Sequence, residues 1–242
     1  MGMRERVAVG VLGVVAVLVG AGVTLAGGRG RGPGAPPATG PRGRAPTLNA
    51  VTGATTVPDE QGFIRRWALL EPMAANGIGE KAFREVALKE HFAGQLKMVP
   101  GDGQKVTADG AGLTWHAYDT TQYNVNLYHF SYALGKATNN MIWYVATVVN
   151  AAEEMKDVRL AIGSNDASIW WVNGEELVGL YENRMDTFDD GVSKRVTLKK
   201  GANVIWAAIG NEMGPTDFCA RLLDKEGKPL KNVTVSVGEA AK

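Results

Sequence analysis

Two polar residues near the middle of the sequence are the first candidates for chemistry. Asn165 and Asp166 follow a run rich in β-formers, and their side-chain oxygens can accept hydrogen bonds from a ligand hydroxyl or coordinate a calcium ion. Asx side chains in such a place also hydrogen-bond to their own backbone, so a plain turn is the alternative. The pair therefore predicts either a ligand anchor or a turn.

Two adjacent tryptophans, Trp170 and Trp171, follow in the next β-rich run. Side chains alternate between the two faces of a strand, so the two indole rings must point in opposite directions. The ring that faces away from the core is our candidate for a platform on which a sugar stacks. Packing of that ring under a loop or a helix is the alternative.

A charged segment follows the tryptophans. Arg184 and Asp186 can form charge-assisted hydrogen bonds to ligand hydroxyls. Asp186 begins the acidic stretch DTFDDG, whose carboxylates lack the one-three-five spacing that surrounds a calcium ion with oxygen ligands. A plain acidic loop is therefore favoured over a calcium loop. The predicted ligand-binding residues are Asn165, Asp166, Trp170, Trp171, Arg184 and Asp186.

The usual enzyme signatures are missing from the sequence. Gly163-Ser164-Asn165 lacks the second glycine of a Gly-x-Ser-x-Gly elbow, which argues against an esterase. The three histidines lack the spacing of a zinc site, and Cys219, the single cysteine, can form neither a thiolate cluster nor an internal disulfide. We expect a non-catalytic protein without a cofactor, with a structural calcium ion as the open question.

Short β-rich runs separated by turn residues must position these side chains. Asn173-Gly174 between two of the runs is a strong hairpin signal, because a type I′ turn requires positive φ at both central positions. One amphipathic helix is predicted over residues 80–92. The pattern predicts an all-β jelly-roll sandwich with one short helix. The expected strands are 63–70, 113–118, 141–149, 158–163, 168–173, 175–180, 193–198, 203–209, 218–223 and 233–237.

The N-terminus carries a different signal. Residues 7–26 contain no charged side chain, and a helix over this run would reach across the bilayer core of about 30 Å at about 1.5 Å per residue. We expect a retained signal anchor, that is, a transmembrane helix, with a cleaved secretory signal as the alternative. The Gly-, Pro- and Arg-rich stretch after it predicts a disordered linker. The predicted segments are a short basic N-terminus (1–6), the transmembrane helix (7–26), the linker (27–60), the sandwich (61–237) and a tail (238–242).

Charge limits the partners. The chain has 26 basic and 25 acidic side chains, and this near neutrality argues against a nucleic-acid partner. Arginines lie on both sides of the apolar run. The more numerous ones follow it, and the positive-inside rule taken literally then places the body in the cytoplasm. Membrane orientation stays open on these grounds.

A series of motifs along the chain resembles a known domain. The motifs are 163–166 (GSND), 169–175 (IWWVNGE), 198–205 (LKKGANVI), 218–221 (FCAR) and 224–230 (DKEGKPL). Together they resemble the galactose-binding-like β-sandwich, a carbohydrate-binding-module-like domain of bacterial envelope and glycoside-hydrolase-associated proteins. Residues 63–72 are similar to its first strand, and the likeness covers residues 61–237. The resemblance implies an extracytoplasmic domain that binds a glycan.

We therefore expect a membrane-tethered, non-catalytic carbohydrate-binding module of the bacterial cell envelope, on the periplasmic or cell-surface side. Its expected partners are a polysaccharide or glycan, the membrane through the N-terminal helix, and other envelope proteins, without nucleic acid. A structural or assembly module that binds envelope proteins is the first alternative, and a divergent glycan hydrolase is the second. Loops at one end of such a sandwich converge, which predicts that Asp166, Arg184 and Asp186 lie close together.

Overall fold

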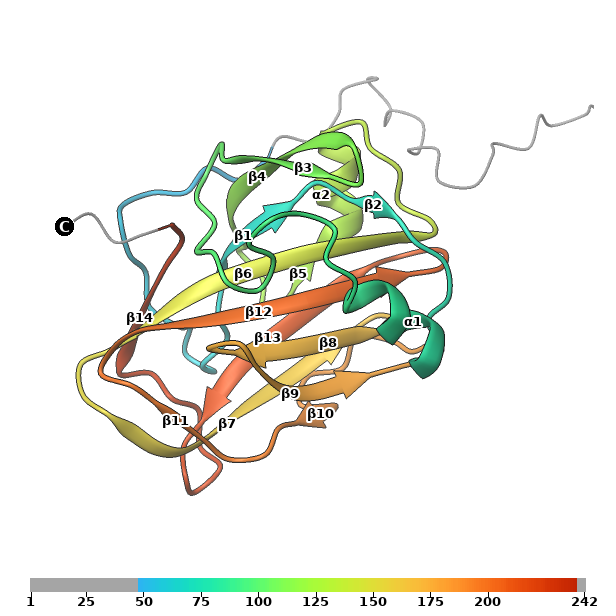
Figure 1. Cartoon of the computed structure of the whole chain (residues 1–242). Helices are drawn as coiled ribbons and strands as arrows, with labels where there is room; N and C mark the ends of the chain where they lie inside the picture. The colour runs from blue at the N-terminus through green and yellow to red at the C-terminus, as the bar shows by residue number, and fades with distance from the viewer. Residues whose placement is uncertain (1–47, 239–242) are drawn as a thin grey trace, which may run out of the picture. The chain divides into compact units, whose positions relative to one another are not determined.

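Two β-sheets, one of them much larger, form the body of the protein (Figure 1). The computed structural model describes residues 48–238. The larger sheet contains β1 (Arg66–Leu70), β2 (Met73–Ala74), β3 (Lys105–Ala108), β4 (Ala111–Asp119), β6 (Met141–Ala151), β8 (Ser168–Val172), β9 (Glu175–Leu180), β12 (Gly201–Asn211) and β14 (Val233–Ser236). The smaller sheet contains β5 (Val125–Asn126), β7 (Met155–Ser164), β10 (Gly191–Val192), β11 (Val196–Leu198) and β13 (Asp217–Leu223).

β6 and β12 form the centre of the larger sheet. They pair antiparallel over their whole lengths, from Met141 opposite Asn211 to Ala151 opposite Gly201. The other edge of β6 is shared in turn by β2, β1 and β14. The main path of the larger sheet is β3-β4-β1-β6-β12-β8-β9, and that of the smaller sheet is β10-β7-β13-β5.

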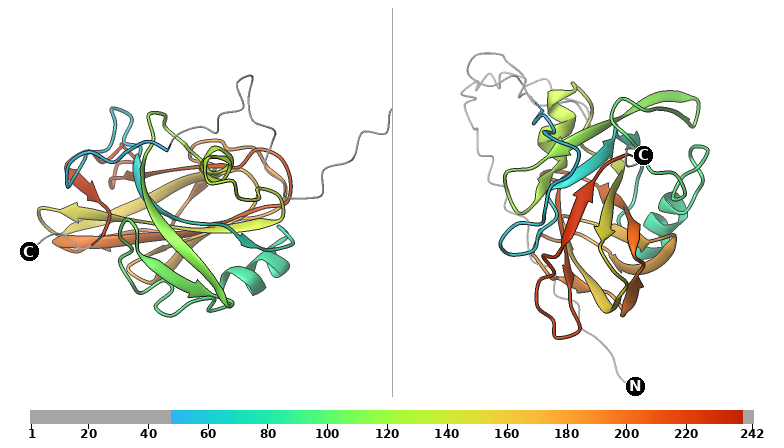
Figure 2. Two further views of the ribbon diagram at one scale, coloured as in Figure 1. Left: turned by 90° about the horizontal axis from the view of Figure 1, so that it is seen from above. Right: turned by 90° about the vertical axis from the view of Figure 1, so that its left-hand side faces the viewer.

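Apolar side chains cover both faces of the larger sheet, so the protein has two cores. The first core lies between the two sheets and includes Trp67, Trp143 and Trp170. The second core lies on the opposite face of the sheet. The helix α1 (Glu80–Ala87) and the segment after it cover this face, as the ribbons in Figures 1 and 2 show. The ring of Phe83 in α1 lies directly over Gly210 of β12. The helix thus adds a third layer to the two-sheet sandwich.

The all-β prediction is confirmed, with differences in detail. The predicted strands coincide with β1, β4, β6 to β9 and β11 to β14, although β1 begins only at Arg66 and β11 only at Val196. The four short strands β2, β3, β5 and β10, and the second helix, α2 (Leu127–Ala133), were not predicted. The jelly-roll connectivity stays a prediction.

The predicted helix over 80–92 ends early, at Ala87. The last carbonyl groups of a helix need partners outside it, and here two buried side chains supply them. The Tyr144 hydroxyl donates to the carbonyl of Ala87 (2.8 Å), and His91 Nε2 donates to that of Val86 (2.9 Å). The chain can therefore turn away from the helix without leaving buried carbonyls unpaired.

Residues 48–60, which the sequence places in the linker, contact the sandwich. The buried guanidinium of Arg66 donates to the carbonyls of Thr52 (2.7 Å) and Gly53 (2.9 Å). Thr56 exchanges two backbone hydrogen bonds with Val235 (2.9 and 2.8 Å). The ordered domain thus includes this segment. The apolar run 7–26 lies outside the described residues, and no helix within residues 48–238 is long and apolar enough to cross a membrane.

Candidate functional site

A pocket of about 460 Å³ opens at one end of the two sheets, where four connections meet. They are the β4–β5, β7–β8, β9–β10 and β12–β13 connections. The lining includes Asn165, Asp166, Arg184 and Asp186. The structure thus brings together four of the six residues predicted to bind a ligand.

Gly163, near the end of β7, allows the β9–β10 connection to pack closely. A Cβ atom at this position would overlap the carbonyl oxygen of Thr187 and would lie 2.7 Å from Asp186 Oδ1. No larger residue fits without moving the connection. The position of Asp186 beside β7 therefore requires a glycine at position 163.

The three aspartates of the DTFDDG stretch share no partner with one another. Asp186 accepts hydrogen bonds from Asn124 Nδ2 (3.3 Å) and Cys219 Sγ (3.5 Å). Asp189 forms a bidentate ion pair with Arg221, and Asp190 pairs with Arg184. Carboxylates that diverge in this way cannot surround one ion. Across residues 48–238, no three His, Cys, Asp or Glu side chains lie close enough to hold a metal.

Arg184 lines the pocket, but its charge is already paired. Its Nε atom donates to Asp190 Oδ2 at 3.0 Å, and its Nη1 atom donates to the carbonyl of Tyr181 at 3.1 Å. Both partners belong to the same stretch of chain as Arg184. The guanidinium therefore stabilises the β9–β10 connection, and its contact with a ligand stays a prediction.

Asp166 forms the turn between β7 and β8. Its φ is 59°, and its side chain is buried. Its Oδ2 atom accepts the backbone N–H of Glu212 (3.0 Å), and its own N–H donates to the carbonyl of Arg184 (3.3 Å). Burial raises the pKa of Asp166, and hydrogen bonding to the backbone of Glu212 and of Arg184 opposes this shift. Asp166 therefore ties three connections together, while Asn165 contributes its side chain to the lining.

The two tryptophans point in opposite directions, as predicted, but neither forms a binding platform. Trp170 is 0% exposed in the core between the sheets, and Trp171 is 3% exposed in the second core. The expectation of an exposed tryptophan is wrong because α1 and the segment after it cover the outer face of β8. No sugar can stack on either ring.

Exposed apolar side chains surround the pocket instead. Tyr123 (37% exposed), Met185 (80%) and Met213 (71%) are among its lining residues. Phe188 (55%) forms a T-shaped ring contact with Tyr123, with ring centroids 6.4 Å apart. We call these four residues the apolar rim. Exposed large apolar side chains gathered in one place indicate a binding surface.

Besides Asp166, two carboxylates line the pocket, those of Asp186 and Asp217. Burial, together with the nearby charge of Asp186, raises the pKa of Asp217 to about 6. Burial likewise raises the pKa of Asp186, although its hydrogen bonds oppose the shift. Asn124, Asn165, Asp186 and Asp217 form what we call the polar wall.

Unpaired buried polar atoms gather beside this wall. Five buried side-chain nitrogen or oxygen atoms lack a partner in residues 48–238, and three of them belong to Asn211, Thr216 and Asp217. Such an atom costs about 1–3 kcal/mol of stability. Asn211 ends β12, Thr216 lies in the β12–β13 connection and Asp217 begins β13. A group of such atoms around one connection is a feature that folding does not require.

The sequence indicated only part of this site. It did not single out Tyr123, Met185, Met213 or Asp217. One usable signal was present: Tyr123 is an aromatic residue inside the polar turn segment TTQYN, where no strand or helix pattern gives it a place in a core. Asp217 gave no signal, because it is a single acidic residue at the start of a mostly apolar strand.

No family model matches the sequence, and no curated protein matches it. Solved structures that are similar to the chain include a PA14 sugar-binding domain from an RTX adhesin, with 11% identity, coverage of 72% of this chain and 100% of that one, and a TM-score of 0.41. Another is the PA14 domain of the MpAFP antifreeze protein, with 11% identity, 80% and 98% coverage, and a TM-score of 0.42. A GH31 α-xylosidase from Xanthomonas citri is similar over 81% of this chain and 19% of its own, with 10% identity and a TM-score of 0.31. None of these likenesses is strong enough to assign a ligand.

Proposed function

We propose that this domain is a non-catalytic carbohydrate-binding module whose ligand occupies the pocket between the apolar rim and the polar wall. The observation that supports this most is the combination of the two surfaces. A sugar ring has an apolar face of C–H groups and an edge of hydroxyls. An exposed Tyr123 beside Asn124, Asn165 and Asp186 offers a partner to both.

Charge in the pocket favours a neutral, hydroxyl-rich ligand over an anionic one. The single cationic side chain among the described lining residues, Arg184, is paired with Asp190. Asp186 and Asp217 would repel an anion when ionised, and as carboxyl groups they accept hydrogen bonds from hydroxyls. The pocket volume of about 460 Å³ lies within the usual range of about 300–1,000 Å³ for small-molecule sites.

We further propose that the module is tethered to a bacterial membrane and acts outside the cytoplasm on a glycan of the cell envelope. The apolar run 7–26 and the Gly-, Pro- and Arg-rich stretch after it support this arrangement. Fractionation of cells, followed by protease treatment of intact cells and of spheroplasts, tests it. A body protected from protease in both preparations would place the domain in the cytoplasm.

Assembly with other envelope proteins is the second candidate function. The observation that favours it is the exposure of Met185 and Met213, because methionine adapts its shape to different protein partners. The two candidates differ in the ligand, since a glycan needs the polar wall and a protein partner depends mainly on the apolar rim.

A glycan array with the full-length chain in detergent, followed by calorimetry on any glycan bound, tests the proposal. Tyr123→Ala should weaken binding at least about tenfold, which corresponds to about 1.4 kcal/mol. Leu88→Ala is the matched control, because Leu88 is also an exposed apolar residue (46%) but follows α1, outside the pocket lining. Equal loss in both variants, or no glycan bound by the wild type, would contradict the proposal. Release of new reducing ends from a bound glycan would favour a hydrolase instead.

A further inference from the structure

A second pocket, of about 630 Å³, lies on the other side of Tyr123. Residues 56–61 form most of its lining, together with Arg65. Tyr123 belongs to the lining of both pockets. The two pockets therefore share one aromatic side chain as their common wall.

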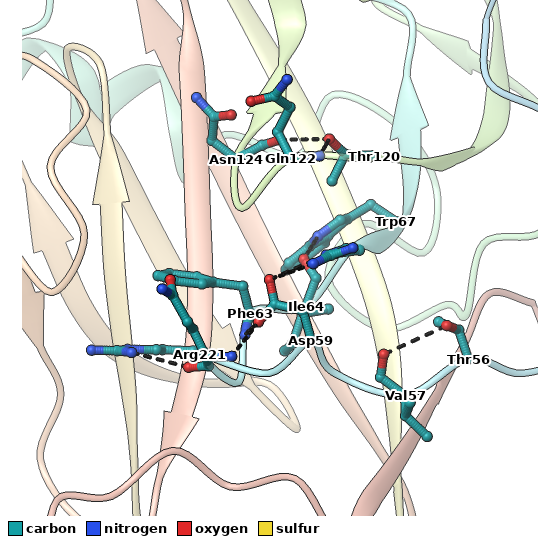
Figure 3. Close-up of polar contacts among 12 residues, drawn as sticks. Thr56, Val57, Asp59, Phe63, Ile64, Trp67, Thr120, Gln122, Asn124 and Arg221 are labelled. Atoms are coloured by element: carbon teal, nitrogen blue, oxygen red, sulfur yellow. Dashed lines mark hydrogen bonds and ion pairs between the residues drawn. The ribbon is translucent and has the colours of Figure 1, made fainter.

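Tyr123 is held in place from two directions. The Thr120 hydroxyl closes its turn by donating to the carbonyl of Asn124 (2.7 Å) and accepting the N–H of Gln122 (3.1 Å), as Figure 3 shows. Its ring packs against the buried ring of Phe63, with centroids 5.4 Å apart. A ligand that contacts Tyr123 thus meets a preorganised surface, which lowers the entropic cost of binding.

Arg221 fixes the outer walls of the two pockets relative to each other. Its Nη1 atom donates to the carbonyl of Gln61 (3.0 Å) in the second pocket, while its other nitrogens pair with Asp189 in the β9–β10 connection. Its guanidinium lies 5.0 Å from the ring centroid of Phe63 and 5.7 Å from that of Phe188. Figure 3 shows Arg221 next to Phe63. One side chain therefore links the segment at Gln61 to the β9–β10 connection.

The second pocket repeats the chemistry of the first. Asp59 organises its wall: its Oδ1 atom accepts the N–H groups of Gln61 and Phe63 (both 2.9 Å), and its Oδ2 atom accepts from Arg65. This leaves the exposed side chains of Glu60 and Gln61 as hydrogen-bonding groups next to the exposed apolar Val57. Amide and carboxylate groups beside an apolar contact thus occur on both sides of Tyr123.

We infer that the ligand is a linear oligosaccharide chain that crosses Tyr123 and occupies both pockets. This inference rests on the proposed function and narrows it from a single sugar to a chain of several units. Two open pockets of similar chemistry, separated by one exposed aromatic ring, fit consecutive units of a chain better than one terminal sugar. The Arg221 contacts keep the two binding surfaces in a constant relative position.

Calorimetry of the full-length chain with cello-, malto- and chito-oligosaccharides of one to six units tests the inference. Affinity for the series that binds should rise at least about tenfold between the shortest oligosaccharide that binds and the hexamer. The double variant Glu60→Ala/Gln61→Ala should lower hexamer affinity about fivefold or more without changing affinity for the shortest one. This variant removes exposed side chains and leaves the backbone hydrogen bonds of the turn in place. Tyr123→Ala should weaken binding at every length.

The matched control is Glu153→Ala, which removes an exposed acidic side chain from the turn between β6 and β7, outside the linings of both pockets. It should bind oligosaccharides of every length like the wild type. Equal affinity for short and long oligosaccharides, unchanged in the double variant, would overturn the inference and leave a one-pocket binding module in place. Absence of binding at every length, to all three series and across the glycan array, would overturn the proposed function as well.

Discussion

Replacement of Gly163 by alanine should displace the β9–β10 connection, which lines the candidate site. The new Cβ atom would lie 2.7 Å from Asp186 Oδ1 and 2.9 Å from Cys219 Sγ, and would overlap the carbonyl oxygen of Thr187. The last contact is the decisive one, because a backbone atom cannot rotate out of the way. The β9–β10 connection must therefore move away from β7.

The expected cost follows from these distances. Asp186 Oδ1 must retreat by about 0.7 Å to reach an ordinary contact of about 3.4 Å, and Thr187 must retreat further. Overpacking of this kind costs typically about 1–3 kcal/mol, and we expect a value near 2 kcal/mol. For a domain of this size, each kcal/mol lowers the melting temperature by about 2–4 °C, so the variant should melt about 4–8 °C lower.

Thermal and urea unfolding of the full-length chain provide the measurement, with Gly112→Ala as the control. Gly112 lies in β4 without a positive φ, and a Cβ atom there would meet nothing within 4 Å. Alanine at Gly112 should leave stability unchanged or raise it slightly. Equal melting temperatures for the two variants would refute the packing argument. Loss of glycan affinity in Gly163→Ala, but not in Gly112→Ala, would show that ligand binding depends on the position of the β9–β10 connection.

Two further changes test the hairpin and the polar wall. Gly174→Val should cost about 1 kcal/mol or more from backbone strain alone, because Gly174 has a φ of 83° and open space around it; an unchanged melting temperature would refute the type I′ turn. Asp217→Asn should stabilise the protein by about 1–2 kcal/mol at pH 7.5 and by much less at pH 4. Burial and the Asp186 charge raise the pKa of Asp217 from 3.8 to about 6. Ionisation of Asp217 therefore lowers the stability of the wild type as pH rises from about 4 to about 6, and asparagine avoids this loss. Urea unfolding at both pH values measures the difference, and an equal gain at both would contradict it.

The sequence predicted the strands well because the evidence for them is local. β9 has the predicted bounds, and Asn173 and Gly174 both have positive φ, as a type I′ turn requires. The third layer could not be predicted in the same way. Whether Phe83 of the helix packs on the larger sheet depends on contacts between residues far apart in the chain, such as that with Gly210.

The same limit applies to the site. Alternation predicted correctly that Trp170 and Trp171 face opposite sides, but it cannot reveal that both sides are covered. The convergence of loops brought Asp166, Arg184 and Asp186 together as expected, whereas their partners were not predictable. Whether Arg184 is free or paired depends on Asp190 within a turn of particular geometry, and no spacing rule encodes that geometry.

The pocket end of the protein carries several features that lower stability without helping the fold. Met185 and Met213 expose apolar side chains to water, and Asp217 keeps a buried oxygen without a partner and a raised pKa. Proteins retain such costs mainly where function requires them, and changes that relieve them tend to impair activity. The Asp217→Asn variant tests whether the polar wall binds a ligand or has no function. If the pocket binds a ligand through its polar wall, the stabilised variant should bind more weakly. If the wall has no function, stability should rise without any loss of binding.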